Sequence, residues 1–104
     1  MSREINEDDF DESVEDGLTL VECYRNGCVP CKNFSESISD IEQEIPNLNI
    51  FTLNIEENME IAAEFKIMSV PTFLLFEDGE LIWQGSAYNG KDSFVNLIES
   101  FIGE

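Results

Sequence analysis

Residues 18–31 read LTLVECYRNGCVPC, and this stretch decides the fold. Its first seven residues place Leu, Leu, Glu and Tyr on one face and Thr, Val and Cys on the other, which is typical of a strand buried on both faces. An Asn-Gly turn follows at 26–27. Apolar residues then recur at spacings of three and four, which predicts a helix over about residues 28–45. A pair of cysteines therefore stands where a buried strand passes into the clearest helix of the chain.

The rest of the sequence predicts further short helices and strands. Asn6 can cap a first helix ending near Gly17. We further expect strands at 3–5, 49–55, 72–76 and 80–84, helices at 59–65 and from 91 onward, and a two-residue hairpin turn at 78–79. Strands separated by helices are expected to be parallel neighbours. The sequence thus predicts an α/β fold, with a mixed central β-sheet flanked by helices on both faces, in one domain over residues 1–104.

Composition excludes several classes of function. The chain has 23 Asp and Glu against five Lys and Arg, and its net charge of −18 repels phosphate and anionic lipid, so we expect neither nucleic acid nor membrane as a partner. The same charge favours a monomer. Histidine is absent, which excludes Ser-His-Asp triads, Cys-His nucleophiles and His-ligated metals. With no apolar leader and no run approaching the ~18 apolar residues of a membrane span, we expect a cytoplasmic protein.

The motif Cys28-Val29-Pro30-Cys31 is the strongest candidate for a reactive site. A helix N-terminus favours thiolate over thiol at the first cysteine, and proline is well tolerated in a first helical turn. The alternatives are half a zinc site or two cysteines that meet in the core by chance, but zinc normally takes four Cys or His ligands. The remaining cysteine, Cys23, fits a strand position in the core. In a reducing cytosol the close pair therefore indicates redox chemistry.

Further motifs strengthen this interpretation. LNIEEN at 53–58, SVPTFLLFEDGE at 69–80 and a final glycine at 85 follow the cysteine pair in order. With them the chain resembles the thioredoxin family along nearly its whole length, with Cys-Val-Pro-Cys as a variant active-site motif. The resemblance implies a thioredoxin fold, protein-disulfide reductase activity, disulfide-containing client proteins, recharging by a thioredoxin reductase, and no metal or organic cofactor.

The resemblance also implies roles for single residues. Cys28 would attack a client disulfide, and Cys31 would resolve the mixed disulfide. Pro71 matches a cis-proline whose loop stands against the cysteines, and the Val70 backbone would pair with an extended client segment. The alternative for Pro71 is a strand-entry proline without a functional role. The predicted client-facing surface consists of Gly27, Val29, Pro30, Val70, Pro71 and Gly85.

Glu22 falls where the family has a buried aspartate beneath the resolving cysteine. It shares a strand face with Leu20 and Tyr24, which predicts burial and a raised pKa. That would suit a proton acceptor for Cys31. Thr52 replaces the family's neighbouring lysine, which should raise the pKa of Glu22 further. The alternative is an acid that reaches solvent at the strand end.

Two other functions stay open at this point. Gly27 replaces the family's usual tryptophan and Val29 its usual glycine, so the client-facing surface is altered. A dedicated electron donor for one oxidoreductase system would fit that change. A redox-inactive binding module built on the same fold is the third possibility, and the intact cysteine pair argues against it.

Overall fold

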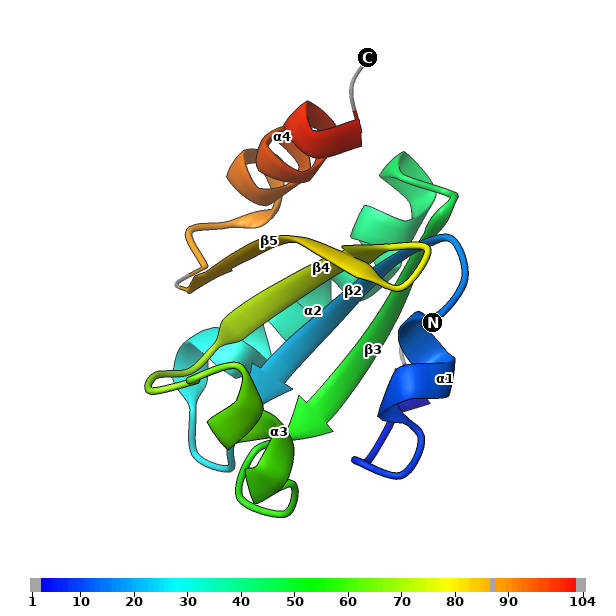
Figure 1. Cartoon of the computed structure of the whole chain (residues 1–104). Coiled ribbons are helices and arrows are strands. Elements are labelled where there is room, and N and C mark those ends of the chain that lie inside the picture. The colour runs from blue at the N-terminus through cyan, green and yellow to red at the C-terminus, as the bar shows by residue number, and fades with distance from the viewer. Residues whose placement is uncertain (1–2, 87, 103–104) are drawn as a thin grey trace.

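A five-stranded mixed β-sheet forms the centre of the molecule in a computed structural model that describes residues 3–86 and 88–102 (Figure 1). The elements in chain order are β1 (Arg3–Glu4), α1 (Phe10–Val14), β2 (Leu18–Tyr24), α2 (Val29–Glu44), β3 (Leu48–Asn54), α3 (Met59–Glu64), β4 (Thr72–Glu77), β5 (Glu80–Ser86) and α4 (Lys91–Ile102). The strands lie in the order β1-β3-β2-β4-β5. The five residues 1–2, 87 and 103–104 of the predicted domain lie outside the described part.

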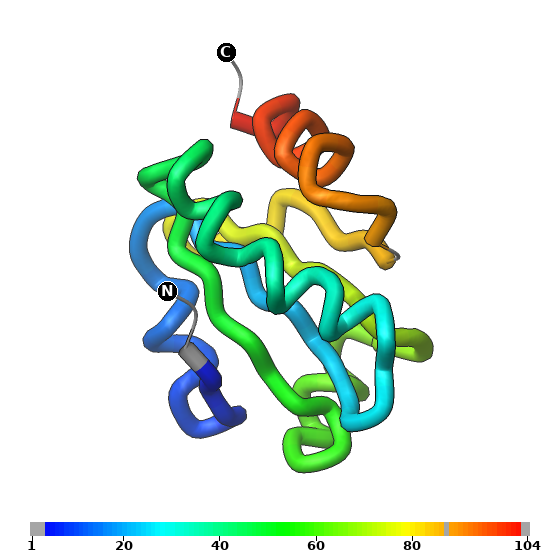
Figure 2. Tube along the Cα trace, turned by 180° about the vertical axis from the view of Figure 1, so that it is seen from behind, coloured from blue at the N-terminus to red at the C-terminus, as the bar shows by residue number. Residues whose placement is uncertain are grey.

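Helices cover both faces of the sheet, as predicted. On one face lie α2 and α4 (Figure 2). The cluster of buried side chains on this face includes Leu20, Phe34, Phe73 and Ile98. On the other face α1 and α3 contribute Phe10, Val14 and Ile61 to a second cluster, which contains Val21, Leu53 and Leu74. Alternation along β2 therefore divides its side chains between two cores. None of the described helices is long and apolar enough to cross a membrane.

The parallel pairing of β2 and β3 follows from the length of α2. Seven residues of β2 span about 23 Å, and the 16 residues of α2 span about 24 Å, so the helix carries the chain back to the starting edge of the sheet. Cys28 is the N-cap of this helix and Ile45 its C-cap, within one residue of the predicted bounds.

The expectation that strands separated by helices are parallel neighbours holds for β2 and β3. It is wrong for β1, which pairs with β3 and not with β2, and it is wrong for β4. β4 instead pairs antiparallel with β2, with Cys23 opposite Thr72. The six-residue helix α3 spans only about 9 Å, too little to return the chain along β3. β4 therefore starts at the edge where β2 and β3 end. This reversal brings residues 69–71 to the edge that also holds the start of α2.

Two smaller features agree with the sequence. Asp78 and Gly79 both have positive φ, 50° and 89°, and join β4 to β5 in a two-residue hairpin with Glu77 opposite Glu80. Oδ1 of Asn6 accepts hydrogen bonds from the backbone N–H groups of Asp8 and Asp9 at 2.9 and 3.1 Å. Asn6 thus caps a first turn, while α1 itself begins later, at Phe10.

Candidate active site

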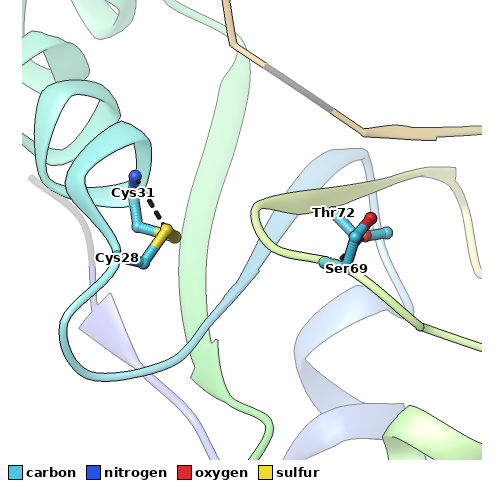
Figure 3. The surroundings of a disulfide bond; sticks show 4 residues. All are labelled: Cys28, Cys31, Ser69 and Thr72. Carbon is cyan, nitrogen blue, oxygen red and sulfur yellow. Dashed lines mark hydrogen bonds between the residues drawn. A yellow bond between two sulfur atoms is a disulfide. The ribbon is translucent and has the colours of Figure 1, made fainter.

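Cys28 and Cys31 form a disulfide at the N-terminus of α2, with their Cα atoms 5.3 Å apart. Sγ of Cys28 accepts a hydrogen bond from the backbone N–H of Cys31 at 3.2 Å, so the sulfur itself caps the helix (Figure 3). A thiolate at this position would accept the same bond with a full negative charge and would face the positive end of a 16-residue helix. The local structure therefore favours ionisation of Cys28 after reduction.

The two sulfur-bearing residues differ in exposure. Cys31 is buried, at 5% of its accessible surface, whereas Cys28 is half-buried. Between them Val29 is 68% exposed and Pro30 is also exposed. Gly27 has a φ of 81°, a left-handed conformation that favours glycine, and a Cβ there would meet no atom within 4 Å. The motif thus presents Cys28 to solvent and covers Cys31.

Glu22 lies on the α2 side of the sheet, opposite Thr52 of β3 and Phe73 of β4. It is 2% exposed, and burial raises the pKa of its carboxyl from 4.5 to about 8. Its Oε2 atom is buried and has no hydrogen-bond partner among the described residues. The prediction of a buried acid with a raised pKa is confirmed, and the alternative of an acid reaching solvent is wrong.

A pocket of about 360 Å³ connects this acid to the cysteine pair. Its lining consists of Glu4, Glu22, Tyr24, Arg25, Asn26, Gly27, Cys28, Cys31, Lys32, Ser35 and Thr52. Glu4, Thr52 and Glu22 stand at the same register of β1, β3 and β2, so their side chains share one face of the sheet. The phenol of Tyr24 donates a hydrogen bond to Oε2 of Glu4 at 2.6 Å. Cys28, Cys31 and Glu22, which the sequence proposed separately, therefore border a common space.

Sequence reasoning missed part of this pocket. Glu4 belongs to a two-residue strand whose pairing with β3 no sequence pattern indicates. Ser35 lies one turn after Cys31, and helical spacing alone could have placed it beside the motif. Among the described residues no group of three or more His, Cys, Asp or Glu side chains could hold a metal ion.

The loop before β4 lies at the same edge of the sheet as Cys28. The Val70–Pro71 peptide bond is cis, as the resemblance implied. Oγ1 of Thr72 donates a hydrogen bond to the carbonyl of Ser69 at 2.6 Å, closing the loop on itself (Figure 3). The ring of Pro71 is fully buried, whereas Val70 is half-buried. The ring of Pro71 is therefore not part of the exposed surface on which it was expected, whereas Val70 is partly accessible.

Gly85 lies within β5, opposite Phe73, one residue beyond the expected end of that strand. It lines a smaller pocket of about 240 Å³ together with Lys66, Ile67, Met68, Ser69, Thr72, Gln84 and Ser86. A Cβ at this position would overlap the indole of Trp83, which itself packs on Phe101. Packing of the tryptophan is thus a sufficient structural reason for glycine here.

Cys23 takes no part in this site. Its side chain faces the opposite cluster from Glu22 and is fully buried. Burial, with a smaller effect from the Glu22 carboxylate, raises the pKa of its thiol to about 12. It is a core side chain, as the strand pattern predicted.

An α/β sheet that presents a bonded cysteine pair at a helix N-terminus, above a buried acid, defines a thiol-disulfide oxidoreductase. The thioredoxin family model matches residues 1–101, and the chain belongs to the thioredoxin family. It is 33% identical over 94 residues to a thioredoxin of Chlamydia muridarum, which covers 90% of this chain and 92% of that protein. It is 28% identical over 99 residues to a thioredoxin of Staphylococcus saprophyticus, covering 94% of this chain and 95% of the other.

A solved structure supports the fold independently. A thioredoxin mutant from Halobacterium salinarum matches with a TM-score of 0.85 at 22% sequence identity, covering 96% of this chain and 89% of that one. Together with the cysteine pair, family membership establishes protein-disulfide reduction as the activity and disulfide-containing molecules as the substrates.

Proposed function

We propose that Cys28 is the attacking thiolate and Cys31 the resolving thiol of a general protein-disulfide reductase. The assignment is supported by the greater exposure of Cys28 than of Cys31, because only the more exposed residue can reach a client. The hydrogen bond from the Cys31 N–H and the N-terminus of α2 both stabilise a negative charge on Cys28. Cys31 has no comparable position at the surface.

The reaction balances with these two residues alone. The Cys28 thiolate attacks one sulfur of the client disulfide, forming a mixed disulfide and releasing the other client sulfur as a thiolate, which takes a proton from solvent. Cys31 then loses its proton and attacks Sγ of Cys28. The second client thiolate leaves, and two electrons have passed from the cysteine pair to the client.

Glu22 is proposed as the proton acceptor for Cys31. It borders the same pocket as Cys31 and has an unpartnered carboxyl oxygen. Its pKa of about 8 lies near that of an ordinary thiol. The carboxylate is the minor form at pH 7, and it is this form that accepts the Cys31 proton, with the matched pKa values favouring the transfer. Thr52, where the family has a lysine, supplies no cation that would hold this carboxyl ionised.

The client surface would surround Cys28. We propose that a client segment lies in extended form against the Val70 backbone, with Gly27, Val29 and Pro30 on one side and Gly85 on the other. Val29 at 68% and Met68 at 92% exposure offer apolar contacts there. A dedicated donor for one oxidoreductase is the second candidate, because Gly27 and Val29 give this surface its own shape. Poor turnover of a generic disulfide protein would favour that second function.

We also propose a reductase partner, a cellular location and an oligomeric state for the protein. A thioredoxin reductase would regenerate the Cys28–Cys31 dithiol. The chain would act in the cytoplasm as a monomer, with residues 1–104 forming one domain. The charge of −18 supports the monomer, since like charges oppose self-association at low salt.

Trapping of clients tests the assigned roles. Cys31→Ser should retain disulfide-linked clients from a lysate, because the mixed disulfide at Cys28 cannot be resolved. Cys28→Ser should retain none, and since it still carries Cys23 and Cys31 it is also the control for adventitious thiols. Equal trapping by the two variants would refute the assignment.

A kinetic measurement tests Glu22. Glu22→Gln should slow release of the mixed disulfide by at least about 10-fold, while its formation changes little, because general-base catalysis is lost from the second step only. Rapid acid quenching followed by intact-mass spectrometry measures the two steps separately. An unchanged release rate would mean that the carboxyl has a structural role alone.

A further inference from the structure

The pocket between Cys28 and Glu22 has an unusual charge for this protein. The chain carries only five Lys and Arg against 23 Asp and Glu, yet two of those five cations, Arg25 and Lys32, line this one pocket. Both are exposed, and neither forms an ion pair within residues 3–86 and 88–102. Lys91, in contrast, is paired with Glu44 and Asp92. The positive charge beside Cys28 is therefore free to meet a partner.

The two cations of this pocket outnumber its ionised acids. Glu4 accepts a hydrogen bond from Tyr24, which orients its carboxylate towards the phenol. Glu22, with its pKa at about 8, is mostly uncharged at pH 7. Glu22 also lines the pocket, but its unpartnered Oε2 is buried, so the residue adds little negative charge to the space that a ligand would enter. No other charged residue of the described chain lines this space.

The pocket lies beside Cys28, the residue to which a client would be bound. Gly27 and Cys28 form part of its wall, so the pocket adjoins the residue through which a client would be attached. Gly27 carries no side chain to obstruct the entrance, and its Cβ position is open. A volume of about 360 Å³ accommodates a carboxylate side chain together with water.

We propose that this pocket is a subsite for an acidic side chain of the client, so that disulfides flanked by Asp or Glu are the preferred substrate class. The inference rests on the function proposed above. Arg25 and Lys32 bind the client carboxylate, and Asn26, Ser35 and Thr52 supply further polar contacts. At physiological salt the Debye length is about 8 Å, so these adjacent cations outweigh the distant acids of the chain.

The test uses three peptide disulfides that differ only in the residues flanking one cysteine, which are Asp, Asn or Lys. The second-order rate constant for reduction by the reduced protein is divided by that for dithiothreitol, which removes the intrinsic reactivity of each peptide. We expect a normalised Asp-to-Lys ratio of about 10, because each exposed ion pair contributes about 3-fold. In Arg25→Gln/Lys32→Gln the ratio should fall to near 1, whatever the absolute rates.

Two matched variants serve as controls. Lys91→Gln removes one positive charge beside Glu44, which lies at the far end of α2 about 22 Å from Val29, and should keep the wild-type ratio. Lys66→Gln removes a cation from the smaller pocket and should also keep it. An unchanged ratio in the double variant, or an equal loss in Lys66→Gln, would overturn the assignment to this pocket.

The Asn peptide distinguishes failure of the acidic subsite from failure of the reductase function. Rapid reduction of the Asn peptide without any preference for Asp would overturn the acidic subsite and leave the reductase function intact. Failure of the wild-type protein to reduce any of the three peptides would overturn the proposed function itself.

Discussion

The buried carboxyl of Glu22 predicts an unusual dependence of stability on pH. An acid whose pKa is higher in the folded than in the unfolded state binds its proton more tightly when folded. Its contribution therefore favours folding fully below the unfolded-state value of 4.5 and is lost as pH rises to the folded-state value of about 8. Each pKa unit corresponds to about 1.4 kcal/mol, so ionisation of Glu22 costs the folded state about 5 kcal/mol once pH exceeds both values.

Replacement by glutamine removes this dependence. Glu22→Gln keeps the shape of the side chain but cannot ionise, and all other titrating groups are shared with the wild type. The free energy of unfolding of the variant, minus that of the wild type, should therefore rise by about 4 kcal/mol between pH 5 and pH 9. A constant offset from the changed hydrogen bonding does not affect this slope.

Urea unfolding of the disulfide form measures the difference directly. Trp83 is the single tryptophan and packs against Phe101, so its fluorescence reports loss of tertiary structure. Both proteins are unfolded at pH 5, 6, 7, 8 and 9 with the Cys28–Cys31 bond intact. Parallel stability curves would refute the reasoning, because they would mean that Glu22 titrates alike in the folded and unfolded states.

Three further predictions follow from the contacts around the site. Thr52→Lys places an ammonium opposite Glu22, and should move the pH at which the Glu22 contribution is lost down by about one unit in the same unfolding series; an unmoved transition would mean that position 52 does not reach the acid. Gly85→Ala forces a methyl group into the indole of Trp83, and should lower the free energy of unfolding by about 1–3 kcal/mol in urea titrations; wild-type stability would show that the indole moves freely. Asn58→Ala removes two hydrogen bonds made by a buried amide and should cost about 2 kcal/mol by the same assay, with a loss below 0.5 kcal/mol counting against it.

Much of the fold could be predicted because local patterns and global packing agree. The interior strand at residues 18–24 and the helix that follows have clear periodicities. The alternating strand contributes to the clusters on both faces of the sheet, and the apolar face of the helix packs on one of them. The Asp78-Gly79 turn was predictable because its conformation needs residues that tolerate positive φ. The antiparallel direction of β4 was harder to predict. It depends on α3 being too short to return the chain along β3, and hydrophobic periodicity gives no information on that comparison of lengths.

The site was predictable at the positions whose residue types are unusual for this chain or for their place in it. Cys28 and Cys31 stand out in any sequence, and Glu22 stands out as an acid within an apolar strand. A strand at residues 3–5 was expected, but the place of Glu4 in the wall of the pocket was not predictable, because the register of so short a strand comes only from its pairing with β3. The burial of Pro71 was likewise hidden, since a sequence does not tell whether a proline ring or its backbone faces outward.

Transfer of electrons from one cysteine pair to a client disulfide is the central claim, and a stoichiometric exchange tests it most directly. The reduced protein is mixed with an equal amount of a disulfide-containing client, quenched in acid and analysed by intact-mass and peptide mass spectrometry. We predict that the chain loses two hydrogens with a Cys28–Cys31 bond formed, while the client gains two and Cys23 stays unmodified. Client reduction that leaves Cys28 and Cys31 as thiols, or a disulfide that includes Cys23, would contradict the account.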